Sequence, residues 1–260
     1  ITGTQTYSNL SASEYRFIGN PYASPISPSA ILTDNTNFSN IWVWDPELAS
    51  QGAYVVFSGS AYSNTSGSYS SGQPIQSGQA FFVKPHTTSN FIINESHKTS
   101  TVDNGLFSKT KEPSKTIQGS SKILRVNLVK QIENNWKPFD AVMTLFHSTT
   151  SNALDAFDAV KMFNPSNNIT IQKSGVSLMA EHRTLDNVQD PIQLRVKDTE
   201  MGGNYKLTIQ TEDFSNLGLS ARLVDLVTNT SVPISLNGAV SEYSFVPSAT
   251  QNAVDRFSIV

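Results

Sequence analysis

The feature that most constrains the fold is a strict alternation of apolar and polar residues in the second half of the chain. In residues 124–128, 192–197 and 205–210, every second side chain is apolar. Successive side chains of a β-strand point to opposite faces, so each stretch has one apolar and one polar face. Half-buried antiparallel strands joined by short turns are typical of two packed sheets. We therefore predict an all-β chain whose residues 123–260 form a jelly-roll-like antiparallel β-sandwich.

The first part of the chain also has the pattern of β-structure. Short apolar runs lie near residues 15–18, 41–44, 53–58, 80–84 and 90–94, and clusters of Gly, Pro, Asn and Ser separate them. The run at 15–18 stops at Gly19, and three prolines follow within the next nine residues. Because proline restricts its own backbone and that of the preceding residue, we predict a rigid, non-helical corner here. Gly19 is expected to adopt a backbone conformation costly for other residues, or to lie close to a neighbouring strand.

The segment 109–122 is the clearest domain boundary. It is polar and rich in lysine, and Ile117 is its only large apolar residue. This composition favours an exposed linker over a packed element. We predict an N-terminal β-domain at 1–108, a linker at 109–122 and the β-sandwich at 123–260. The one helical candidate, at 151–160, is expected to form a turn or two at most.

Composition excludes several classes of function. The formal net charge is −3 with a pI of about 5.8, so no basic surface for nucleic acid or an anionic membrane is expected. The chain has no cysteine, which excludes disulfides, thiolate metal sites and a cysteine nucleophile. No apolar run approaches the roughly 20 residues of a transmembrane helix. Low charge, at 15%, is common in secreted β-rich modules. The first residue is Ile1, so we expect a fragment or a processed form.

Several motifs resemble one family. They are FIGNPY at 17–22, WVWD at 42–45 and SGQAFFV at 77–83, followed by DAVKM at 158–162, VSL at 176–178 and DRFSI at 255–259. In this respect the chain resembles the C-terminal region of large surface proteins of Bacteroidetes that the type IX secretion system exports. The resemblance implies an adhesin-like part of a secreted or cell-surface protein. Two departures are Pro28-Ser29, where the family often has Ile-Asp-Trp, and the absence of a sorting segment before Val260.

Residues with obvious chemistry are few. The serine-hydrolase, zinc-protease, phosphate-loop and EF-hand motifs are absent, and the four histidines are dispersed, so we predict no catalytic residues and no enzyme activity. Asp155 and Asp158, with Asp140 upstream, form the one concentrated acidic group. These carboxylates are weak candidates for a calcium site, since hard cations prefer several oxygen ligands. The alternative is a capped turn in which they accept free backbone N–H groups, and we favour it.

Trp42 and Trp44 alternate on one predicted strand and therefore share a face. If that face is open, the two indoles form a platform for sugars, together with Tyr54, Tyr62 or Tyr69. If the strand is central, both are core, which we favour because the next strand is apolar on both faces. The chain is thus predicted to be a non-catalytic structural or interaction module, extracellular or on the outer cell surface. The alternative is a glycan-binding module, and the expected partners are a surface protein or an extracellular glycan.

Overall fold

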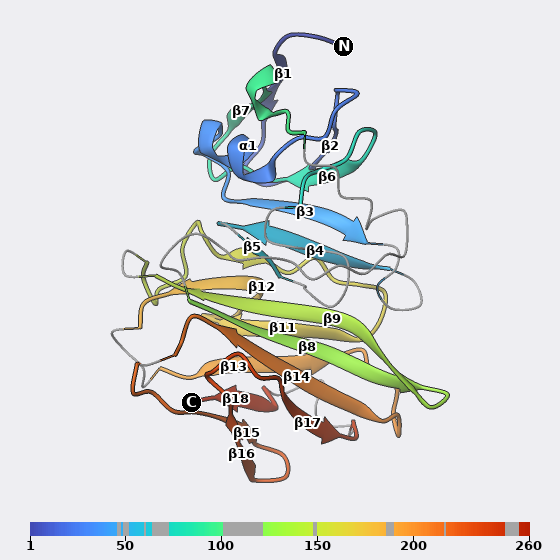
Figure 1. Ribbon diagram of the computed structural model, residues 1–260, viewed down its shortest axis with the longest axis vertical. Helices are drawn as coiled ribbons and strands as arrows, with labels where there is room; N and C mark the ends of the chain where they lie inside the picture. The colour runs from blue at the N-terminus through green and yellow to red at the C-terminus, as the bar shows by residue number, and fades with distance from the viewer. Residues whose placement is uncertain are drawn as a thin grey trace. The chain divides into compact units, whose positions relative to one another are not determined.

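The computed structural model describes most of the chain (Figure 1). The described residues are 1–45, 48, 52–59, 61–63, 73–100, 122–147, 150–185, 190–215, 217–247 and 255–260. Two compact units are present: Ile1–Asp45 with Val55–Gln118, and Pro46–Tyr54 with Gly119–Val260. The division after Gln118 falls within the segment predicted as a linker. That segment lies outside the described residues except for Lys122, which begins a strand.

Among its described residues, the first unit contributes strands to two sheets and has one α-helix, α1 (Pro28–Asp34). A two-stranded antiparallel sheet pairs β1 (Gln5–Leu10) with β7 (Ser89–Ile93), and the 3₁₀ helix η1 (Glu95–His97) follows it. The larger sheet has the order β2 (Arg16–Gly19), β6 (Ala80–Val83), β3 (Asn40–Asp45), β4 (Ala53–Ser58) and β5 (Ala61–Tyr62). The sequence indicated every strand of these sheets except β1 and the two-residue β5.

One face of the larger sheet forms the core of the first unit. Ile18 lies opposite Phe81 across β2 and β6, and Ile41 lies opposite Val83 across β3 and β6; all four are fully buried. Phe91 of β7 packs against Phe81, with 6.2 Å between ring centroids. Two sheets that pack in this way bury the alternate apolar residues of each strand.

The predicted non-helical corner is wrong in its second half, because α1 begins at Pro28. Proline is well tolerated at the first helical position, where its missing N–H would have no intrahelical partner. The Ser27 side chain accepts a hydrogen bond from the Ala30 N–H at 3.3 Å and so caps the helix. The prolines at 21 and 25 do precede a non-helical segment, as expected.

The predicted role of Gly19 is also wrong. Its φ lies outside the left-handed region, and a Cβ at this position would meet no atom within 4 Å. The buried side chain of Asn20 holds the corner instead. Its amide nitrogen donates to the carbonyl oxygens of Ser24, Ile75 and Gln76 at 2.9, 3.2 and 3.0 Å, and its oxygen accepts from the Tyr22 N–H at 3.0 Å. The backbone groups of the turn are therefore satisfied by one amide.

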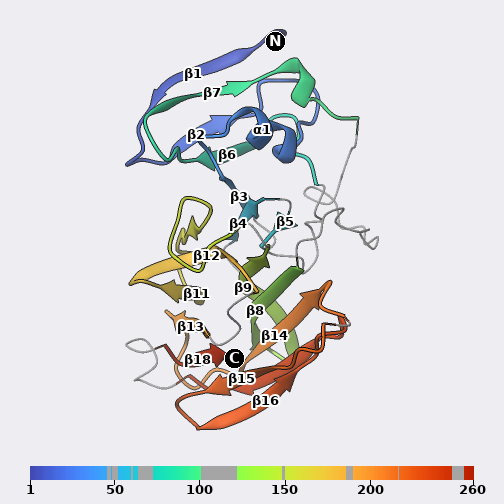
Figure 2. The ribbon, with the colours of Figure 1, turned by 90° about the vertical axis from the view of Figure 1, so that its left-hand side faces the viewer.

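The second unit is built on one 11-stranded sheet. Its order is β16 (Thr230–Ile234), β15 (Ala221–Asp225), β18 (Phe257–Ile259), β13 (Ile192–Lys197), β11 (Asn168–Lys173), β12 (Val176–Arg183), β9 (Asn135–Phe146), β8 (Lys122–Ile132), β14 (Tyr205–Glu212) and β17 (Ser241–Phe245), and β10 (Ala159–Val160) also pairs with β12. Figure 2 shows β12, β11, β13 and β18 on one side of this unit, β9, β8 and β14 on the other, and β15 and β16 at one end. The sheet therefore folds over its own core.

The alternation in the sequence correctly identifies this core. The apolar residues of 124–128, 192–197 and 205–210 are all buried in it. The all-β, sandwich-like fold is confirmed, but the prediction of a purely antiparallel sheet is wrong, because β9 and β12 are parallel from Met143 and Ala180 onward. The sequence also missed β16, and residues 151–160 form bends and a turn before the two-residue β10.

The polar face of β8 differs from the prediction as well. Arg125 lies on the predicted polar face of this half-buried strand, yet it is only 1% exposed, and Asn127 on the same face is also buried. Arg125 forms an ion pair with Glu212 of β14, and Asn127 donates to the Thr208 hydroxyl at 3.1 Å. Both faces of this strand are thus buried, with cross-strand polar pairs on one of them. Among the described residues, no helix combines the length and apolar character needed to cross a membrane.

Candidate functional site

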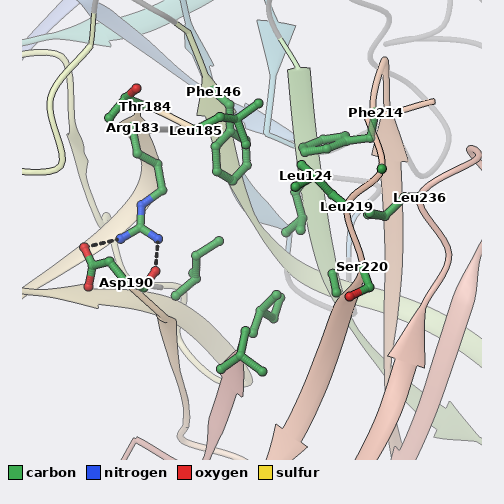
Figure 3. A pocket seen from close by; sticks show the side chains of 15 residues that line it. Leu124, Phe146, Arg183, Thr184, Leu185, Asp190, Phe214, Leu219, Ser220 and Leu236 are labelled. Carbon is green, nitrogen blue, oxygen red and sulfur yellow. Dashed lines mark hydrogen bonds and ion pairs between the residues drawn. The ribbon is translucent and has the colours of Figure 1, made fainter. Parts of the chain in front are cut away.

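An apolar pocket lies at one end of the core of the second unit (Figure 3). Its volume is about 300 Å³. The apolar residues that line it come from the ends of several strands and from the connections between them: Leu124, Phe146, Leu185, Ile192, Phe214, Leu219, Ala221, Leu236, Ile259 and Val260. Several of these side chains also belong to the buried core. The pocket is therefore an extension of the core toward the surface.

The connection that follows β14 forms one wall. Phe214 packs edge-on against Phe146, with ring centroids 5.4 Å apart. Gly218 has a φ of +67°, in the left-handed region, which glycine adopts at low cost. Leu219 follows that turn and is partly exposed at the rim. Loop residues supported by strands are common in binding sites.

Arg183, at the end of β12, forms the polar side of the pocket. It is 5% exposed, and its guanidinium donates to the Asp190 carbonyl oxygen at 2.7 Å and to the Asp190 carboxylate at 3.0 Å (Figure 3). The Glu181 carboxylate lies 3.1 Å from Arg183 Nε. Two carboxylates thus balance this charge, which makes the pocket wall polar without leaving a free cation.

A buried charge network continues behind Arg183. Lys173 Nζ lies 3.0 Å from Asp158 Oδ2 and 3.3 Å from Glu181 Oε1. Burial raises the pKa of Glu181, although the nearby Arg183 and Lys173 oppose that shift. Burial lowers the pKa of His182, so its imidazole is neutral near pH 7. Each buried charge of this network lies near a charge of opposite sign, which offsets the cost of removing it from water.

Each of the three acidic calcium candidates has hydrogen-bond partners within the protein, and Asp158 also accepts the Asp155 N–H at 3.1 Å. Both oxygens of Asp140 lie 2.6 Å from Lys161 Nζ, in a fully buried pair. Asp158 accepts from Lys173 and from the His182 N–H, at 3.0 and 2.8 Å. Asp155 accepts the Phe157 N–H at 2.9 Å, which is the capped turn that the sequence favoured. In the part of the chain that the structure describes, no three His, Asp or Glu residues are placed to hold a metal ion.

The predicted aromatic candidates do not form one open platform. Trp42 is 3% exposed and packs edge-on against Tyr15, with ring centroids 5.0 Å apart. Tyr62 is also buried, and its hydroxyl donates to the Gln73 carbonyl oxygen at 3.1 Å. Trp44 and Tyr54 are half-buried, and Tyr69 lies outside the described residues.

The four histidines do not gather in one place: His86 and His97 lie in the first unit, whereas His147 and His182 lie near each other in the second, where the His147 N–H donates to the Arg183 carbonyl oxygen at 3.0 Å. His97 is buried with its Nε2 2.9 Å from the Asp34 carboxylate, and His86 lies 2.8 Å from the Ser39 hydroxyl. The pocket residues were missed because they lie at strand ends that are far apart in the sequence. Their one local signal was the apolar character of Leu185, Phe214 and Leu219, which lie in connections and not in strands.

The comparisons with known proteins identify a family but no activity. A family described as "Domain of unknown function (DUF8693)" matches the whole chain, residues 1–260. No curated protein matches the chain, and no solved structure matches it.

Proposed function

We propose that this chain, which belongs to the DUF8693 family of domains of unknown function, is a non-catalytic interaction module of a secreted or cell-surface bacterial protein. In this proposal, the apolar pocket of the second unit receives an apolar group of the partner. The observation that carries it is the lining of that pocket, where strand ends and connections present apolar side chains around a volume of about 300 Å³. Pockets of this size and lining bind ligands by burying apolar surface.

The charges beside the pocket support binding over catalysis. General acid–base catalysis requires a titratable group within hydrogen-bond reach of the substrate, with a pKa suited to the reaction. Here the charged wall residue, Arg183, is held between Glu181 and Asp190. Such a network favours a rigid wall, because each charge is stabilised by its neighbours. No cofactor forms part of the proposal, and calcium at Asp155 and Asp158 has little support, since Asp158 binds Lys173.

The proposed location rests on the sequence. The motifs at 17–22, 42–45 and 77–83 resemble those of exported surface proteins, and the low charge agrees with such a role. The alternative, glycan binding through the aromatic residues near Trp42 in the sequence, has less support, because Trp42 and Tyr62 are buried.

Filling the pocket tests this proposal. Ser220 is an exposed lining residue, so Ser220→Trp should place an indole within the pocket. We expect 8-anilinonaphthalene-1-sulfonate, a fluorescent probe whose aromatic rings bind in apolar pockets, to bind the native chain and to lose at least about tenfold in affinity in this variant, or about 1.4 kcal/mol. The matched control is Ser215→Trp, which adds the same side chain at an exposed position outside the lining. Equal affinity for the probe in all three proteins would contradict the proposal.

A further inference from the structure

A second hollow of the same unit lies beside β17 and shares no lining residue with the apolar pocket. Its volume is about 470 Å³. Trp136, Gln131 and Asn204 line it together with residues of β17. This hollow, which we call the Trp136 groove, combines an exposed aromatic ring with neutral polar side chains.

Strand pairing places these side chains next to one another. Gln131 of β8 lies opposite Trp136 of β9 across the hairpin. The Gln131 N–H donates to the Asn204 carbonyl oxygen at 2.9 Å, which extends the pairing to the start of β14. The register of the sheet therefore holds the indole and the two amides in a row.

The indole of Trp136 is fixed in orientation and partly open. The residue is 39% exposed, which is unusual for so large an apolar side chain. The Lys206 ammonium lies 4.8 Å from the ring centroid, and Lys206 is itself held by Glu242 at 2.8 Å. A cation on one side of the ring orients it, while the exposed part of the ring is available to a ligand.

The two amides present one donor and one acceptor. Asn204 Nδ2 donates to Gln131 Oε1 at 3.0 Å. Gln131 Nε2 and Asn204 Oδ1 have no hydrogen-bond partner among the described residues. A donor and an acceptor on neighbouring side chains complement hydroxyl groups, each of which both donates and accepts.

The charges around the groove are balanced within the protein. Arg256 donates to the two oxygens of Asp225 at 3.1 and 2.8 Å and to the Val246 carbonyl oxygen at 2.9 Å. Its guanidinium also lies 4.8 Å from the Phe245 ring centroid. Since Lys206 pairs with Glu242, neither cation is free to neutralise a phosphate or a carboxylate. The groove thus favours an uncharged ligand.

We propose that the Trp136 groove binds a neutral oligosaccharide. One sugar ring stacks its apolar C–H face on the open part of the indole, whose negative π-face attracts those C–H groups. Its hydroxyls exchange hydrogen bonds with Gln131 Nε2 and Asn204 Oδ1. This inference does not depend on the proposed role of the apolar pocket.

Calorimetric titration of the whole chain with cellohexaose, mannohexaose and chitohexaose tests the proposal. We expect at least one hexasaccharide to bind. Trp136→Ala should lower its affinity about tenfold or more, and Trp136→Tyr should retain most of it, because a smaller ring still offers a π-face. The matched control is Phe163→Ala, since Phe163 is 47% exposed, also lies beneath a lysine (Lys197, at 5.4 Å) and is outside the groove. This control should bind as the native chain does.

Three results would overturn the assignment. The first is no binding of any hexasaccharide at 10 mM, about tenfold above a weak 1 mM dissociation constant. The second is an affinity that Trp136→Ala leaves unchanged or that Phe163→Ala lowers equally, in variants with native melting curves. The third is binding of decaproline that depends on Trp136 when no hexasaccharide binds, which would identify a peptide site.

Discussion

Trp42 of the first unit and Trp136 of the second both lie on β-strands, but their environments are opposite. Trp42 is 3% exposed and lies on a central strand, whereas Trp136 is 39% exposed beside a groove lined by amides. The flanking residues account for this difference. Ile41 and Val43 surround Trp42, while Asn135 and Lys137 surround Trp136. An aromatic residue on a strand with two apolar faces belongs to the scaffold, and one at a polar hairpin end is available for binding.

Polar groups show the same contrast within the second unit. Asp140 and Lys161 satisfy each other in a fully buried pair, and Asp140 also accepts the Ile169 N–H at 2.7 Å. At the Trp136 groove, by contrast, Gln131 and Asn204 use only part of their hydrogen-bonding capacity on each other. Groups satisfied internally specify the fold, whereas groups with spare capacity at a surface can bind a ligand.

The largest expected effect is that of Trp42→Ala. Removing a buried indole loses its burial and leaves a cavity, so the free energy of unfolding should fall by about 3–5 kcal/mol. Urea denaturation measures this change. Trp136→Ala is the comparison variant and should cost about 0.5 kcal/mol or less, as surface substitutions usually do. Similar losses in the two variants would mean that both indoles belong to the scaffold.

A somewhat smaller loss is expected for Asp140→Ala. This change leaves Lys161 buried without its carboxylate, which typically costs about 3 kcal/mol or more. We expect a loss of about 3 kcal/mol and not a larger one, because burial lowers the pKa of Lys161 and favours loss of its proton. The control is Asp155→Ala, which removes a half-buried turn cap and should cost about 1 kcal/mol. If the two variants melted alike, the buried pair would not be a structural element.

The smallest effects concern the corner after β2. Gly19→Val should change the free energy of unfolding by no more than about 0.5 kcal/mol, because a side chain there meets no neighbour. Asn20→Ala should cost about 2 kcal/mol, since it leaves buried carbonyls of the turn unsatisfied. Thermal melting of both variants measures the difference. If Gly19→Val destabilised the chain more than Asn20→Ala did, Gly19 and not Asn20 would be the residue that holds the corner.

The sequence predicted which face of each strand is buried better than it predicted which strands pair with one another. Alternation depends only on the two-residue repeat of a strand, so the inward positions of β8, β13 and β14 could be assigned directly. The parallel pairing of β9 with β12 joins residues that are distant in the chain, and no local pattern encodes it. Helix α1 was missed because Pro28 was interpreted as a helix breaker, although Ser27-Pro28 is also a sound helix start.

The candidate sites were harder to predict than the sheets. The apolar pocket is lined by Leu124 and Phe146 from strand ends and by Phe214 from a connection, and only the folded sheet brings these residues together. Trp136 did carry a local signal, because polar residues surround it in the β8–β9 hairpin. The sequence instead offered Trp42 and Trp44 as the candidate sugar platform, because they alternate on one strand, although their apolar neighbours favoured burial.

The contrast between the two tryptophans can be measured directly in a ¹H–¹⁵N spectrum of the side-chain indoles, since the chain has only three tryptophans. The hexasaccharide that binds most tightly in calorimetry would be titrated into the labelled protein, and Trp136→Phe would assign its resonance. We predict that the Trp136 indole signal shifts on titration while the Trp42 signal does not move. A shift of Trp42 with a stationary Trp136 would contradict this account of which aromatic residue is scaffold and which is binding surface.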